Sequence, residues 1–285
     1  MVPRQQTRNQ QGLNLMITTA SIGELTKMPW TFKTIKKISA NKSILIEGLP
    51  GMGNVGKIAV DFIIDNLNAE KVFEVVGSRF PNCVFVNEEN LIELPSITVY
   101  HKKLKDKSVF LVSGDIQPLD ESSCYEFCNE LLKLCKKYNC KEIITLGGVG
   151  LQKEPKNPKI YLSGNNKMIL EKYKNTKKLN GLVGPIIGVS GLLVGLANNA
   201  KIPAVNIMAE TMGHPNHMGI NGAKQILNML DAKLKLGLDL KRLNKEIKEL
   251  QAGVFDIQNM NEGIDDVELE PLNKSEDKFD KSYMG

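Results

Sequence analysis

One glycine-rich segment, residues 48–57, constrains the fold of this chain more than any other feature. It follows residues 43–47, a short apolar and β-branched stretch that predicts a buried strand. It leads into residues 57–64, where apolar residues recur at helical spacing. A glycine turn between a strand and a helix points backbone N–H groups at whatever lies above it. The segment therefore predicts a strand–turn–helix unit at one end of a sheet.

Two nucleotide-binding patterns overlap in this segment, and neither is complete. Residues 51–57 read G-x-x-x-x-G-K, but a phosphate-binding loop continues with Ser or Thr, whose hydroxyl ligates magnesium, and here Ile58 follows. The same glycines read G-x-G-x-x-G, yet the next strand, residues 72–76, carries its acidic Glu74 inside the strand rather than at its end. A tight turn that brings the helix close to the sheet explains the glycines without any ligand.

Strand-like and helical segments alternate along most of the chain. The short apolar runs predict strands at residues 43–47, 72–76, 83–86, 91–94, 97–101, 109–112, 142–146 and 203–208. Helical spacing predicts helices at residues 57–67, 122–138, 190–200, 221–235 and 239–251. This alternation favours a three-layer α/β/α domain with a mostly parallel central sheet.

Composition divides the chain into three parts. Residues 1–30 are expected to form a partly disordered N-terminal extension, and residues 31–252 the α/β domain with its C-terminal helices. Residues 253–285 are acidic and poorly patterned, which predicts a disordered tail. The apolar stripe of the helix at 239–251 fits packing on the domain or against another subunit, and the sequence does not choose between them.

Charge and cysteine usage narrow the classes of partner. The net charge is +5, the lysines are scattered and aromatic residues are only 6%, so nucleic acid is not an expected partner. No run of 18 apolar residues and no secretory signal are present, so we expect a cytoplasmic protein that does not span a membrane and whose five cysteines stay reduced. Cys124, Cys128 and Cys135 share one helix face, which favours core packing over a zinc site.

Four segments follow predicted strands, where ligands bind in open α/β sheets. They are the glycine segment and residues 114–118, 147–150 and 210–217. The candidate residues for binding a ligand or anion in these segments are Gly51, Gly53, Asn54, Gly56, Lys57, Asp115, Gln117, Glu210 and His214.

Neither a metal site nor a catalytic residue is predicted. Glu210, His214 and His217 are residue types that ligate zinc, but Gly213 and Pro215 would break a helix that aligned them. We therefore expect a hydrogen-bonded structural loop there. No nucleophile has a complete motif around it, and Ser190 is better explained as the N-cap of the helix that follows. No cofactor is expected.

The four segments together resemble the archaeal branch of the proteasome assembly chaperone 2 family. The resemblance covers about residues 44–251 and lies in the order and spacing of G-L-P-G-M-G-N-V-G, G-D-I-Q-P, L-G-G-V-G and E-T-M-G-H-P. It implies a fold like that of nucleoside phosphorylases without their activity. It also implies a cytoplasmic, self-associating chaperone that binds proteasome α subunits, or a related assembly chaperone, and helps the core particle to assemble.

The end of the chain departs from the pattern of this family. Some archaeal relatives end in a hydrophobic residue, tyrosine and any third residue, which docks between α subunits. This chain ends in Tyr283, Met284 and Gly285, with the tyrosine third from the end. These three residues remain candidates for partner binding. The competing hypothesis is an enzyme that uses ATP or another nucleotide at residues 51–57.

Overall fold

The computed structural model describes residues 30–87, 89–118, 120–174, 184–214 and 217–241. The chain separates into two compact units, residues 1–240 and 241–285, and all the elements described below belong to the first. The predicted N-terminal extension, the acidic tail and the helix at 239–251 lie almost wholly outside the described residues. Within those residues, no helix combines the length and the hydrophobicity that a membrane crossing requires.

An eight-stranded sheet forms the middle layer, in the order β1-β3-β6-β7-β2-β8-β10-β9. The four central strands, β7, β2, β8 and β10, run parallel, and the pairs on either side of them are antiparallel. The strands are β1 (Thr31–Thr34), β2 (Ser43–Glu47), β3 (Glu70–Val76), β6 (Ile97–Lys103), β7 (Ser108–Gly114), β8 (Cys140–Leu151), β9 (Ile160–Gly164) and β10 (Ala204–Met212). The predicted parallel sheet is thus confirmed at its centre.

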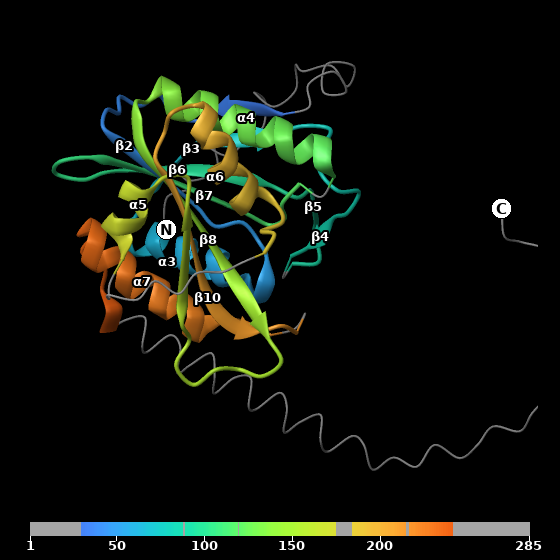
Figure 1. Ribbon diagram of the computed structural model, residues 1–285. Helices are drawn as coiled ribbons and strands as arrows, with labels where there is room; N and C mark the ends of the chain where they lie inside the picture. Colours follow the sequence, from blue (N-terminus) through green and yellow to red (C-terminus); the bar gives the residue numbers. More distant parts are fainter. Residues whose placement is uncertain (1–29, 88, 119, 175–183, 215–216, 242–285) are drawn as a thin grey trace, which may run out of the picture. The chain divides into compact units, whose positions relative to one another are not determined.

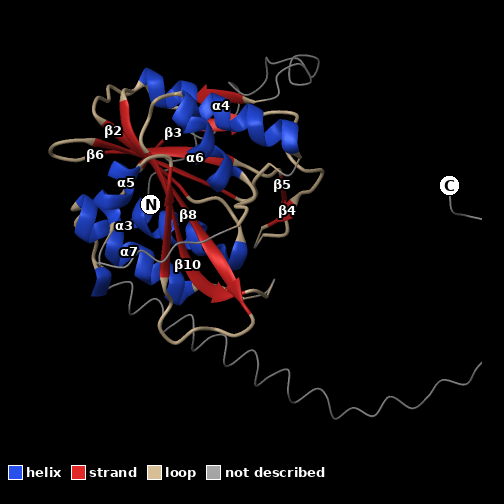
Figure 2. Ribbon diagram, viewed as in Figure 1, coloured by secondary structure: helices blue, strands red, loops and turns tan. Residues whose placement is uncertain are grey.

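Helices cover both faces of this sheet, which confirms the three-layer architecture (Figures 1 and 2). Helices α3 and α7 pack together on one face, and α4 and α6 pack together on the other. The helices are η1 (Met52–Asn54), α3 (Val55–Leu67), α4 (Glu121–Lys137), α5 (Lys167–Tyr173), α6 (Val189–Asn199) and α7 (Ile220–Leu234). Burial on both faces explains why β2 and β7 are continuous apolar runs rather than alternating ones.

Helix α4 shows how local sequence sets this packing. Asp120 caps it by accepting a hydrogen bond of 2.9 Å from the backbone N–H of Ser123. Cys124, Cys128 and Cys135 are buried on its inner face and form no disulfide, so their prediction as core residues is confirmed. Together with Phe127 and Leu131, these cysteines form the buried face of α4, and the helix packs beside α6.

Three predicted boundaries were wrong. The segment 210–217 was expected to be a loop after the last strand, but residues 210–212 belong to β10, which ends at Met212. The segment 147–150 was expected to be a loop, but β8 continues to Leu151 because it pairs in register with the end of β10, up to Met212. Ser190 is not an N-cap, because Gly188 occupies that position and Ser190 lies inside the first turn of α6. Strands β1 and β9, at the two edges of the sheet, and the short helix α5 after β9 were not predicted.

Candidate functional site

The carboxyl ends of the four central strands meet at one end of the sheet. Strand β2 lies between β7 and β8, so the chain continues on one side of β2 and later crosses to the other. At such a switch in strand order the connecting loops diverge and leave a crevice, where open α/β proteins bind their ligands. The glycine segment, the end of β8 and the start of α6 surround this crevice.

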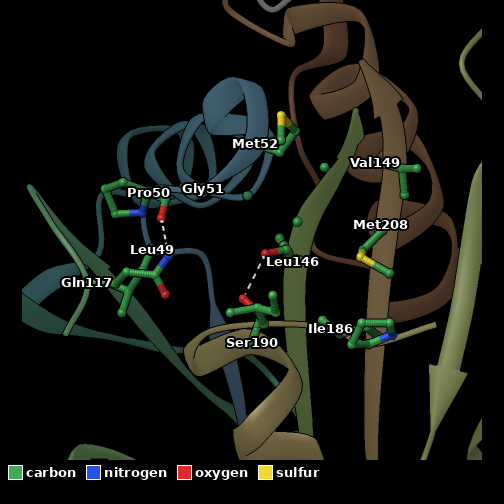
Figure 3. A pocket seen from close by; sticks show the side chains of 15 residues that line it. Leu49, Pro50, Gly51, Met52, Gln117, Leu146, Val149, Ile186, Ser190 and Met208 are labelled. Carbon is green, nitrogen blue, oxygen red and sulfur yellow. Dashed lines mark hydrogen bonds between the residues drawn. The ribbon is translucent and has the colours of Figure 1, made fainter. Parts of the chain in front are cut away.

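A cavity of about 340 Å³ occupies the crevice (Figure 3). Its walls are the turn at residues 49–52, residues 146–149 of β8, residues 185–187 and Ser190 before and within α6, Gln117, and Met208 of β10. The volume lies within the usual range of small-molecule sites, roughly 300–1,000 Å³. Most of the side chains on its walls are apolar.

Steric demands account for several glycines of the turn. Gly53 has a φ of +58°, in the left-handed region that favours glycine. A Cβ on Gly56 would lie 2.4 Å from the carbonyl oxygen of Leu146, so glycine is needed for α3 to approach β8. Asn54 adopts a φ of 51°, a conformation that asparagine tolerates better than most residues. The interpretation of this segment as a tight turn is confirmed for these positions.

Glu47 lies beneath the cavity and was missed by the sequence analysis. It ends β2 and is fully buried, and its carboxylate accepts hydrogen bonds from the Leu49 N–H at 2.9 Å and the Ser190 hydroxyl at 3.0 Å. Burial raises the pKa of Glu47 to about 7, although both hydrogen bonds act in the opposite direction. A charged residue at the end of an otherwise apolar five-residue strand was the signal that could have identified it.

Gln117 connects two walls of the cavity, as Figure 3 shows on the side of the glycine turn. Its amide nitrogen donates to the Pro50 carbonyl at 2.8 Å, and its amide oxygen accepts from the Val189 N–H at 3.2 Å. It therefore joins the glycine turn to the start of α6. Gly51, Gly56 and Gln117 are the predicted site residues that the structure brings together around the cavity.

Lys57 and Asp115 lie at a different hollow, of about 380 Å³, outside this group. The ammonium group of Lys57 forms an ion pair of 2.9 Å with Asp61, one turn further along α3. Asp115 accepts hydrogen bonds from the N–H and the hydroxyl of Ser96, at 3.0 and 2.8 Å. The lysine that a phosphate-binding loop would direct at its nucleotide is therefore engaged elsewhere.

The candidate residues of segment 210–217 also lie apart from the cavity walls. Glu210 lies inside β10, where its carboxylate accepts from the Lys159 N–H at 2.9 Å and from the Tyr161 hydroxyl at 2.8 Å. These bonds attach the neighbouring strand β9. His214 follows the strand, and His217 Nε2 lies 2.7 Å from a carboxylate oxygen of Glu154. Among the described residues, no group of three or more His, Cys, Asp or Glu side chains has the placement of a metal site.

An exposed apolar hairpin projects from the same end of the molecule as the cavity (Figure 1). It consists of β4 (Phe85–Val86) and β5 (Ile92–Glu93), which confirms the two strands predicted on either side of the polar turn at residues 87–90, and it forms a sheet of its own. It is inserted between the end of β3 and the start of β6, which lie beside the carboxyl end of β7. Its six large apolar side chains each expose between 40% and 78% of their surface, and they are Val84, Phe85, Val86, Leu91, Ile92 and Leu94.

Two residues that line the cavity also expose apolar side chains. Met52 of the glycine turn is 47% exposed, and Ile187 at the start of α6 is 88% exposed. Large exposed apolar patches on soluble proteins usually mark interaction sites. The three residues predicted to bind a partner lie outside the described part of the chain, and they are Tyr283, Met284 and Gly285.

Comparison with known proteins identifies relatives of the whole domain. The model of the PAC2 family matches residues 45–258. An uncharacterized protein of Methanocaldococcus jannaschii is 29% identical over 223 residues, which is 77% of this chain and 84% of that protein. A second uncharacterized protein of the same organism is 28% identical over 220 residues, 75% of this chain and 85% of its own length.

Solved structures with the same fold come from Pyrococcus furiosus. PbaB, described as an archaeal proteasome activator, superposes with a TM-score of 0.72 at 24% identity, over 81% of this chain and 99% of PbaB. PbaA, described as an archaeal homolog of proteasome-assembly chaperone, gives a TM-score of 0.70 at 22% identity, over 83% of this chain and 94% of PbaA. At these identities the structural likeness establishes the fold, and the family match is a separate finding.

Proposed function

The chain belongs to the PAC2 family, and from this premise we propose that it is a non-catalytic proteasome assembly chaperone that binds proteasome α subunits and promotes assembly of the core particle. Family membership is the observation that carries the proposal, and it agrees with the resemblance found in the sequence. The descriptions of PbaA and PbaB, whose fold this chain shares, point to the same process.

The apolar hairpin supplies a surface suited to such a partner. A two-stranded hairpin is marginally stable in water by itself, and this one leaves six large apolar side chains exposed. A standard interface buries roughly 800 Å² per partner, and these six side chains would supply part of the apolar area of such an interface. We propose that the hairpin contacts the α subunit, and that the chain also self-associates.

The nucleotide-dependent enzyme has less support from the geometry. Lys57 pairs with Asp61 outside the cavity, Ile58 offers no metal ligand, and none of the described residues on the cavity walls is cationic. A thermal-shift series with ATP, ADP and NAD separates the two functions, because a ligand at 100 times its dissociation constant stabilises by about 2.7 kcal/mol. We expect no shift of the melting temperature with any of the three.

The direct test is capture of purified proteasome α subunits by the full-length chain. We expect capture by the wild type and its loss in a Val86→Ser, Ile92→Ser, Leu94→Ser variant. Met168→Ser is the matched control, because Met168 is 80% exposed on α5. This helix begins just after β9 ends beside the start of β10, so it lies away from the carboxyl ends of the central strands. Tyr283→Ala tests the tail separately. Failure of the wild type to capture α subunits in any stoichiometry would contradict the proposal.

Self-association is tested independently by light scattering coupled to size-exclusion chromatography. The full-length chain is expected to elute with a mass that is a multiple of the 31.6 kDa of one chain. A monomer at all concentrations up to those used for capture would contradict self-association and leave α-subunit binding to be decided by the capture experiment.

A further inference from the structure

The glycines around the cavity fall into two groups. The first group is required by packing: a Cβ on Gly148 would lie 2.2 Å from the carbonyl oxygen of Met52, and one on Gly56 would clash with β8. The second group is Gly51 and Gly147. A Cβ on Gly51 would meet nothing within 4 Å, and one on Gly147 would meet only the flexible side chain of Met208, at 3.5 Å.

Backbone conformation does not explain the second group either. Gly51 has a φ of −162°, an extended conformation that any residue adopts, and Gly147 does not have a positive φ. Both residues line the cavity. Folding alone therefore leaves these two positions free to carry a side chain, and a Cβ at either would take up space at the cavity wall. Glycine at such positions allows a ligand to approach the backbone closely.

The wall formed by β8 offers hydrogen-bonding groups to that space. Strand β2 ends at Glu47, opposite Thr145, whereas β8 continues to Leu151. Beyond Thr145, the β2 side of β8 has no paired strand among the described residues, although its other side remains paired with β10. Alternate backbone N–H and C=O groups of residues 146–149 therefore point to this side, where the Leu146 carbonyl already accepts from the Ser190 hydroxyl at 3.4 Å and the following groups have no strand partner among the described residues (Figure 3). An amide group has the matching donor and acceptor.

The charges around the cavity favour a neutral ligand. Among the described residues that line it, none is Lys, Arg, Asp or Glu. The nearest acidic group described above is Glu47, which lies beneath the cavity and is bonded to Ser190 on its wall. The described walls therefore offer an anionic ligand no cationic side chain, and an ionised Glu47 would repel it. The rest of the wall is aliphatic or thioether in character, including Met52, Ile186 and Met208.

We propose that this cavity is a binding site for an uncharged ligand that carries an amide group on an aliphatic body. The amide lies along the open edge of β8, between Gly51 and Gly147, and the aliphatic body contacts the apolar walls. A small metabolite amide and a hydrophobic residue within a partner's polypeptide share this chemistry. This proposal stands apart from the proposed function, because a small ligand could fill the cavity even if the chain does not bind α subunits.

The test is titration of the full-length chain with N-acetyl-leucinamide, followed by NMR or calorimetry. We expect saturable binding by the wild type and at least tenfold weaker binding by Gly51→Ala and Gly147→Ala. N-acetyl-leucine, the same probe with a carboxylate, is expected to bind at least tenfold more weakly than the amide. Gly195→Ala is the matched control, because a Cβ there also meets nothing within 4 Å but lies on the exposed side of α6, away from the cavity.

Each outcome decides the proposal. Absence of saturable binding by the wild type overturns it, as does equal binding of the amide and the carboxylate. Unchanged binding in both glycine variants, with folding confirmed by cooperative melting and a circular dichroism spectrum like that of the wild type, also overturns it. If the site holds, capture of α subunits in the presence of saturating probe distinguishes the source: competition indicates a residue of the partner, and unchanged capture indicates a small molecule.

Discussion

The glycine turn and the apolar hairpin lie at the same end of the sheet and differ in how far folding alone explains their residues. In the turn, Gly48 and Gly56 lie so close to backbone atoms that only glycine fits, and Gly53 has a positive φ. In the hairpin, six large apolar side chains contribute little to the described core and remain largely exposed. The glycine motif therefore serves mainly the packing of the turn against the sheet, whereas the hairpin carries apolar residues that the fold does not require.

The largest expected effect comes from adding one methyl group where β8 packs against the turn. Gly148→Ala would place its Cβ 2.2 Å from the Met52 carbonyl oxygen, a backbone atom that cannot move away cheaply. We expect a loss of about 3 kcal/mol in the free energy of unfolding, at the upper end for overpacking. Urea denaturation measures it, with Gly51→Ala as the control. Equal stability of the two variants would show that the turn tolerates side chains throughout.

The second prediction concerns Glu47, the buried carboxyl between the turn and α6. Its folded pKa of about 7 exceeds its ordinary value of 4.5, so the folded chain holds this proton more tightly than the unfolded chain does. Its contribution to the free energy of unfolding is therefore most favourable below pH 4.5 and falls as the pH rises to about 7. A shift of this size corresponds to about 3 kcal/mol at most.

Glu47→Gln removes this titration. Its amide oxygen can still accept from the Leu49 N–H, and its amide NH₂ can donate to the Ser190 hydroxyl in place of the bond that Ser190 now donates. We expect the variant to gain stability relative to the wild type between pH 5 and pH 8, by up to about 3 kcal/mol. Urea denaturation of both proteins at the two pH values measures the difference, in which titration of the other groups cancels. A difference that does not change with pH would mean that Glu47 is not protonated more readily in the folded state.

Strand β2 and the hairpin could be predicted from the sequence, whereas the full length of β8 could not. The β-branched run at 43–47 and the polar turn between two apolar segments were sufficient to predict β2 and the hairpin. The extension of β8 through Gly147 and Gly148 was not predictable, because glycine has low strand propensity and only pairing with β10 makes the strand.

The grouping of side chains at the site was harder to predict than the strands. Lys57 belongs to a recognised motif, but its partner Asp61 lies four residues further along the same helix face, a local signal that was present in the sequence. The contact between Glu47 and Ser190 joins residues 143 positions apart, which no local pattern reveals.

The third prediction concerns the turn of the hairpin. The side-chain oxygen of Asn87 accepts from the N–H groups of Glu89 and Leu91, at 3.0 and 2.9 Å, and its amide nitrogen donates to Glu93 at 2.7 Å. Asn87→Ala removes all three bonds, so we expect faster hydrogen exchange within residues 84–94. The free energy of global unfolding should change by less than about 0.5 kcal/mol, because the hairpin is a separate sheet. Loss of global stability by several times this amount would show that the hairpin belongs to the main cooperative unit.

The smallest stability effect is expected for the apolar hairpin side chains themselves, where the functional effect should be large. Val86, Ile92 and Leu94 expose 63%, 71% and 78% of their surface, so replacing all three by serine removes little buried area from the described fold. We expect the melting temperature to change no more than in Met168→Ser, because exposed positions contribute only a few tenths of a kcal/mol each. Capture of α subunits should nevertheless fall at least tenfold in the triple variant. A large drop in melting temperature would place these side chains in a packed core and remove the distinction between the hairpin and the turn, whereas unchanged stability with unchanged capture would assign α-subunit binding to another surface.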